Sequence, residues 1–229
     1  MRLFIVLSYM VLMLEAREII LNADASNMVQ STNIEILKKA YKSLGIDIVV
    51  TSHSLSQSLK LSNSGEIDGE PGRIKKISKK FPNLVRVPVP INYVEAVAFG
   101  KNKDISIKKW AELKPYKIGV VKGVKFIEGP TKDMNKVVYT SFKKAFKDLD
   151  IGKIDLVVCP KVTGRFVVQT QKYHEIFKVS RALKRLHLYH FLHKKNASLV
   201  ASLTPILKEI KKSGEISYIR AAYIRKRTK

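Results

Sequence analysis

A glycine-rich stretch, residues 62–74, holds the side chains of this chain that are best suited to chemistry. Glu66, Asp68 and Glu70 alternate there as side chains do along one face of a strand, and Arg73 follows three residues later. Alternating carboxylates could bind a metal ion or act as the acid and base of a glycosidase. We favour neither interpretation, because a glycine-rich turn that presents one arginine explains the pattern more simply.

Arg73 gives this stretch its main binding potential. The neighbouring glycines allow the backbone to adopt positive φ angles or to lie close to a bound molecule. The guanidinium group of Arg73 has a planar fork of donors that matches a carboxylate or a phosphate. The stretch is therefore either a surface turn with a solvated arginine or part of an anion-binding site.

Histidine and cysteine provide two further candidates. His187, His190 and His193 are spaced three apart, but no carboxylate lies near them in the sequence, so structural roles are favoured over a metal site. Cys159 could be a nucleophile, but no catalytic motif flanks it, and a small buried side chain is the favoured interpretation. The sequence contains no Gly-x-Ser-x-Gly, His-Glu-x-x-His or P-loop motif.

Composition limits the class of protein. The 229 residues are 45% hydrophobic, which is enough for a packed core in one large domain or two lobes. The formal net charge is +24, which favours anionic partners such as nucleic acid, anionic lipid or cell-wall polymers. The lysines are scattered on the polar faces of expected helices, so we do not expect a dedicated nucleic-acid-binding protein. Cys159 is the single cysteine, so no intrachain disulfide can form.

The N-terminus has the pattern of a secretory signal peptide. A positive start is followed by an apolar run from Leu3 to Leu14, which is shorter than the ~20 residues of a membrane span. We expect cleavage after Ala16 and a soluble exported protein, with an uncleaved anchor as the alternative. No cysteine follows the apolar run, so a lipid anchor is not expected.

Hydrophobic periodicity predicts strands that alternate with helices in two successive blocks. This alternation is typical of mostly parallel sheets with helices on their faces, and it fits two α/β lobes. The expected strands are 18–23, 46–50, 67–69, 84–88, 94–99, 116–121, 136–139, 154–159, 175–179 and 186–192, and the expected helices are 34–44, 54–61, 104–113, 123–129, 142–149, 197–213 and 216–224. Pro88 and Pro90 place their strand at a sheet edge or a strand end.

The run from Ser64 to Ile74, Ser-Gly-Glu-Ile-Asp-Gly-Glu-Pro-Gly-Arg-Ile, resembles a signature of the bacterial extracellular solute-binding proteins, family 3. Weaker similarities follow in the family's order. They are a first crossover at Tyr93 to Gly100, the opening of the second lobe at 110–123, a strand element at 148–158, a return crossover at 186–195 and C-terminal helices at 196–223.

This resemblance implies the type II fold of periplasmic binding proteins, with two α/β lobes joined by two crossover strands. Lobe one would comprise residues 17–98 and 190–229, and lobe two residues 99–189. A small solute would bind in the cleft and the lobes would close on it. The residues implicated in ligand binding are Asp24, Ser26, Glu70, Arg73, Tyr93, Gly123, Val124, Thr140, Ser141 and Cys159. No cofactor or metal ion is implied.

The chain departs from the family pattern where α-amino acids are held. Arg73 comes only five residues after Asp68, closer than is usual in the family. Val124 stands where serine or threonine is usual, and Cys159 and Pro160 stand where an acidic residue often holds the ligand ammonium. The ligand is therefore not restricted to an amino acid.

The sequence thus predicts a non-enzymatic periplasmic receptor for a small polar or anionic solute. It would act in uptake by an ATP-binding-cassette transporter or in sensing, as a monomer, with a membrane permease complex as a possible partner. One alternative is an exported enzyme on a related scaffold, since a fold does not fix a function. Another is a basic surface protein that binds anionic polymers.

Overall fold

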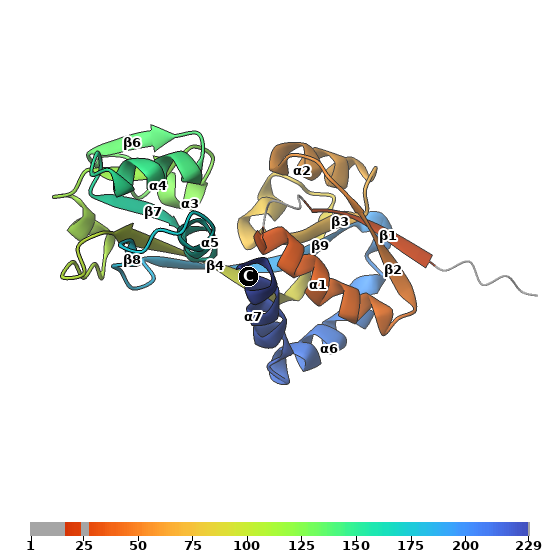
Figure 1. The fold of residues 1–229 in the computed structure, drawn as a ribbon. Helices are drawn as coiled ribbons and strands as arrows, with labels where there is room; N and C mark the ends of the chain where they lie inside the picture. Colours follow the sequence, from red (N-terminus) through yellow and green to blue (C-terminus); the bar gives the residue numbers. More distant parts are fainter. Residues whose placement is uncertain (1–16, 24–27, 229) are drawn as a thin grey trace, which may run out of the picture.

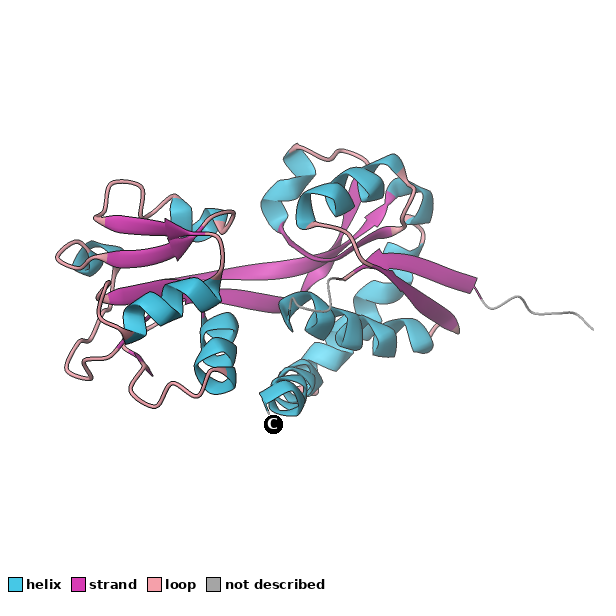
Figure 2. Ribbon diagram, turned by 45° about the horizontal axis from the view of Figure 1, so that its top comes forward, coloured by secondary structure: helices cyan, strands magenta, loops and turns pink. Residues whose placement is uncertain are grey.

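The computed structural model describes residues 17–23 and 28–228. The expected signal peptide, residues 1–16, lies outside this part of the chain, as do Asp24 and Ser26. Two α/β lobes are joined by two long neighbouring strands, which run from one lobe into the other (Figures 1 and 2). No helix in the described part of the chain is both long enough and apolar enough to cross a membrane.

Lobe one is built from both ends of the chain. Its elements are β1 (Arg17–Asn22), α1 (Met28–Lys42), β2 (Ile46–Thr51), α2 (Leu55–Ser64), β3 (Gly69–Ile74), the 3-10 helices η1 (Lys75–Lys79) and η3 (Lys194–Asn196), α6 (Leu199–Lys212) and α7 (Glu215–Thr228). The long strands β4 (Leu84–Gly100) and β9 (Lys184–His193) complete its sheet and continue into lobe two.

Lobe two lies between the two long strands in the sequence. Its elements are the 3-10 helix η2 (Trp110–Leu113), β5 (Ile118–Val121), α3 (Lys125–Glu128), β6 (Lys136–Tyr139), α4 (Phe142–Asp150), β7 (Leu156–Pro160), α5 (Lys161–Thr170) and β8 (Phe177–Lys178). The described strands follow the order β2-β1-β3-β9-β4-β7-β5-β6, with β8 paired to β4. Pairing is parallel within β2-β1-β3 and within β7-β5-β6, so the predicted fold class is confirmed.

Strand β4 shows how the connection between the lobes is made. Its first part, up to Glu95, pairs with β9 alone, and its last part, from Ala96, pairs with β7. Pro88 and Pro90 lie in the first part, where one side of the strand has no partner among the described strands, as expected for an edge. The sequence predicted two strands here, and the structure has one, because an edge strand tolerates the missing N–H groups.

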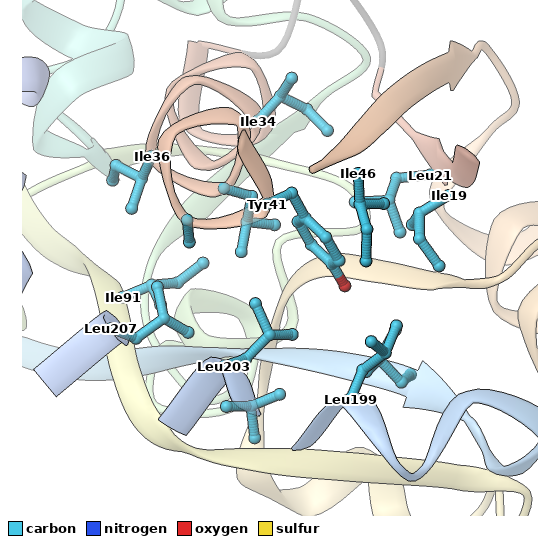
Figure 3. Close-up of a cluster of buried hydrophobic side chains, with 14 of the residues drawn as sticks. Ile19, Leu21, Ile34, Ile36, Tyr41, Ile46, Ile91, Leu199, Leu203 and Leu207 are labelled. Atoms are coloured by element: carbon cyan, nitrogen blue, oxygen red, sulfur yellow. The ribbon is translucent and has the colours of Figure 1, made fainter. Parts of the chain in front are cut away.

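Each lobe has its own packed apolar interior. In lobe one, side chains from β1, β2, α1, β4 and α6 converge on one cluster that includes Ile19, Ile36, Tyr41, Ile91 and Leu203 (Figure 3). In lobe two, separate clusters lie on the two faces of the sheet, and Phe146 packs edge-on against Phe99 in one of them. The apolar side chains of α1, α4 and α6 therefore pack into these interiors.

Three predicted elements were placed wrongly. The strand expected at 67–69 instead occupies 69–74, because Gly69 to Ile74 pairs with β9. The segment 104–113 forms a helix only over its last four residues, as η2. Helix α1 begins at Met28 rather than 34, and Thr32 lies inside the helix, where its hydroxyl donates to the carbonyl of Met28.

Candidate ligand-binding site

Glu70 and Arg73 lie together and bind each other. The Arg73 Nε donates to Glu70 Oε2 at 2.6 Å, and the Glu70 side chain is fully buried. The other Glu70 oxygen accepts hydrogen bonds from Ser58 and Ser62, which lie one turn apart on α2. Arg73 also donates to the Leu55 carbonyl at 3.0 Å. The glycine-rich stretch thus fastens β3 to α2 inside lobe one.

Asp68 makes a second, separate set of contacts. Its Oδ2 accepts from the Ile20 N–H at 2.8 Å, and its Oδ1 accepts from Asn196 at 2.8 Å and lies 3.0 Å from the Lys195 Nζ. Burial alone would raise the pKa of this carboxyl, but these donors hold its pKa below the usual range. Glu66, by contrast, is exposed. The alternating carboxylates therefore have separate partners and do not form a catalytic pair.

His190 belongs to the same framework. Its Nδ1 lies 2.9 Å from the Glu70 carbonyl oxygen, and its Nε2 lies 2.7 Å from the Tyr41 hydroxyl. A carbonyl can only accept, so Nδ1 carries the proton and Nε2 accepts from Tyr41. Burial lowers the pKa of His190 to about 4. The ring is thus held neutral inside lobe one, which is the structural role that the sequence favoured.

The buried His190 predicts a loss of stability in mild acid. Its folded-state pKa lies below the ordinary value of 6.5, so protons bind the unfolded chain first as the pH falls. The stabilising contribution is complete above pH 6.5 and is lost towards pH 4, amounting to about 3 kcal/mol. Urea unfolding of the wild type and His190→Gln across this range measures it. If the free energy of unfolding depended on pH equally in the two proteins, the assignment to His190 would be contradicted. His187→Gln, which replaces an exposed histidine of the same strand, is the matched control.

Lobe two places its sequence-predicted residues in different surroundings. Gly123 and Thr140 are exposed at the carboxyl ends of β5 and β6. The Gly123 N–H donates to Glu128 of the following helix, which has only four residues. The exposed Ser141 caps α4 by accepting from the Lys144 N–H. The Gly123 N–H and the Ser141 hydroxyl are therefore committed to local structure.

Cys159 and Val124 are less accessible. Cys159 is fully buried at the end of β7, and burial raises the pKa of its thiol well above the usual range. Such a thiol is a poor nucleophile at neutral pH. Val124 is half-buried and packs against the apolar interior of lobe two.

A pocket of about 500 Å³ lies where the lobes meet. Helix α7 of lobe one packs against α1 and also against α5 of lobe two, beside the two connecting strands (Figure 1). The pocket is lined from both lobes and the connection by Val29, Tyr93, Val94, Glu95, Pro160, Lys161, Val162, Arg165, Ser217, Arg220, Ala221 and Arg225. Tyr93 is the one described member of the sequence-predicted set that lines it.

Aromatic and ionic contacts hold Tyr93 and Glu95, two of the residues that line this pocket. The guanidinium groups of Arg185 and Arg220 lie 4.6 Å and 3.7 Å from the centre of the Tyr93 ring. Glu95 is almost fully buried, and its two oxygens contact Arg185 and, at 3.3 Å, Lys161. Burial would raise the pKa of Glu95, but the hydrogen bonds from Arg185 and Lys161 lower it below its usual value. Glu95 therefore remains ionised at neutral pH.

The sequence offered little signal for this pocket. Arg220 lies in the helix expected at 216–224 and Arg225 directly follows that range, and both are far in sequence from Tyr93 and Lys161. The one available signal was the position of Lys161 directly after the strand expected at 154–159. Ligands of α/β sheets bind beyond the carboxyl ends of strands, so this position is a candidate for a binding site. Among the described residues, no group of three or more histidine, cysteine, aspartate or glutamate side chains could hold a metal ion.

Solved structures share this architecture. The fold is that of the two-lobed periplasmic binding proteins. A histidine kinase sensor domain with similarity to periplasmic binding proteins superposes with a TM-score of 0.69 at 16% identity, covering 90% of this chain and 96% of that one. An ancestral arginine-binding protein bound to arginine gives 0.69 at 19% identity, covering 90% and 97%. At such identities these likenesses establish the fold.

Two curated proteins are similar to this chain in sequence, but over only part of its length. An uncharacterised protein of Shewanella oneidensis is 28% identical over 68% of this chain, and the ABC transporter arginine-binding protein 1 of Escherichia coli is 29% identical over 57%. These matches span 61% and 54% of the two relatives, so the chain matches little more than half of their length. No family model matches the sequence.

Proposed function

We propose that this protein is an exported receptor that captures a small polar or anionic solute between its lobes. The observation that carries the proposal is the pocket at the connection, because its walls come from lobe one, lobe two and the strands that join them. A solute there would contact both lobes and favour their closed arrangement. We place lobe one at residues 17–98 and 190–229, and lobe two at 99–189.

The similar proteins support a binding role. The E. coli relative is named as an arginine-binding protein of an ABC transporter, and one similar structure holds arginine. By extension, we propose periplasmic export through residues 1–16, action as a monomer and delivery of the solute to a membrane permease. The sensor domain of a histidine kinase has the same fold, so signalling is the second route for the bound solute.

The structure gives little support to an enzyme. Cys159, the one cysteine, is buried with a raised thiol pKa, and the carboxylates of the glycine-rich stretch are paired separately. Tyr93 is the first residue that we propose for solute binding, because it lines the pocket. Asp24 and Ser26 follow β1 in the sequence and are retained as candidates. Gly123, Val124, Thr140, Ser141 and Cys159 are secondary candidates, as are Glu70 and Arg73, whose contacts are internal to lobe one.

Thermal melting against a panel of neutral, cationic and anionic solutes tests this function. A solute that binds only the folded protein, present at about 100 times its dissociation constant, stabilises it by about 2.7 kcal/mol. We expect one solute class to raise the melting temperature saturably by a few degrees. No shift with any small solute, together with salt-sensitive retention on heparin, would overturn the proposal in favour of a polyanion-binding surface protein.

A further inference from the structure

The pocket between the lobes carries a marked excess of positive charge. Helix α5 of lobe two contributes Lys161 and Arg165, and helix α7 of lobe one contributes Arg220 and Arg225. Among the described lining residues, Glu95 is the one acid. In the part of the lining that the structure describes, four cations therefore surround about 500 Å³ with one carboxylate among them.

Glu95 does not neutralise the outer cations. Its side chain is almost fully buried, and its oxygens are occupied by Arg185 and Lys161. The charge of Glu95 is therefore already balanced by Arg185, which does not line the pocket, and by Lys161, which does. Neither oxygen of Glu95 contacts Arg165 or Arg220, so the positive potential of these two guanidinium groups reaches the open volume.

Two of these guanidinium groups have no acceptor among the described residues. Arg165 is exposed, and its side chain forms no hydrogen bond or ion pair with any described residue. The guanidinium group of Arg220 stacks on the Tyr93 ring. Its N–H donors point outward in the plane of the guanidinium group, and none of them has an acceptor in the described part of the chain. Arginine forks of this kind match carboxylate and phosphate oxygens.

We propose that the pocket selects a small anion with two or more negative charges, either a di- or tricarboxylate or a phosphate, held between Arg165 of α5 and Arg220 of α7. This inference rests on the proposed receptor function and names its solute class. One anion would bridge the lobes, because each lobe supplies one of the two arginines. Free arginine brings one carboxylate but carries a net positive charge, so the same groups would repel it overall.

Calorimetric titration of the purified protein with citrate, succinate, inorganic phosphate and L-arginine tests the proposal. We expect saturable binding of at least one of the three anions and none of arginine. The variants Arg165→Gln and Arg220→Gln should each weaken that binding by about 10-fold or more, since each loses a charge-assisted pairing. The control Arg181→Gln removes the same charge from an exposed lobe-two residue outside the pocket and should leave the affinity unchanged.

The possible outcomes separate this proposal from the receptor function. If citrate or succinate binds and phosphate does not, the ligand is a di- or tricarboxylate. If phosphate binds and the two carboxylates do not, the ligand is a phosphate. Binding of arginine, or anion binding that all three variants leave equal, would overturn the anion assignment while the receptor function stands. If none of the four probes binds and the wider melting panel also gives no shift, both proposals fail.

Discussion

Replacing Glu70 with alanine is expected to lower the free energy of unfolding by about 3–5 kcal/mol, because it breaks a buried ion pair and leaves its partner uncompensated. Glu70 is fully buried, and it joins Arg73 on β3 to Ser58 and Ser62 on α2. Arg73 is itself only 12% exposed in its side chain, so water replaces the lost carboxylate poorly. Urea unfolding at neutral pH measures the change.

A double-mutant cycle makes this prediction specific. Arg73→Ala should also destabilise the protein, and the double variant should lose less than the sum of the two single variants, because they share one interaction. Glu66→Ala, which removes an exposed carboxylate from the same stretch, is the matched control and should change stability by less than about 0.5 kcal/mol. Unchanged stability in Glu70→Ala combined with lost solute binding would contradict the structural role.

Truncating Phe146 to alanine should destabilise lobe two by about 3–5 kcal/mol through lost burial and the cavity left behind. The side chain is fully buried on α4, and its ring packs edge-on against Phe99 with 5.5 Å between ring centres. Guanidinium unfolding followed by circular dichroism measures the loss.

The control for Phe146 is chosen from the same lobe. Val138 on β6 is 54% exposed, so Val138→Ala removes apolar atoms that are already in contact with water. That variant should change stability by less than about 0.5 kcal/mol. Equal effects of the two substitutions would show that the interior of lobe two is not packed as described.

Local patterns predicted much of the fold. Apolar periodicity identified α4 and α6, and the two prolines of β4 indicated the edge where they lie. The order of weak similarities predicted the two-lobed arrangement, which the superpositions establish. The helices and the strand edge depend on the spacing of near neighbours in the sequence, which is why local patterns revealed them. The two-lobed arrangement depends on distant contacts, and the resemblance to a family was needed to predict it.

The site was less accessible to sequence analysis. Arg73 has the fork that suits an anion, but its acceptor is Glu70, three residues away, which the strand alternation did not reveal because β3 is irregular there. Ser58 and Ser62, four residues apart on a helix, were the available signal for an internal partner. The pairing of Tyr93 with Arg220 spans more than half of the chain, and no local rule predicts it.

Small-angle scattering of the purified protein, with and without the solute that gives the largest melting shift, tests the central claim most directly. In the described part of the chain two strands run from one lobe into the other, and α5 and α7, which pack against each other, both line the pocket. We predict a saturable decrease in the radius of gyration, with a midpoint at the dissociation constant, as the lobes close on the solute. A solute that stabilises the protein while leaving the radius of gyration unchanged would contradict binding by closure between the lobes.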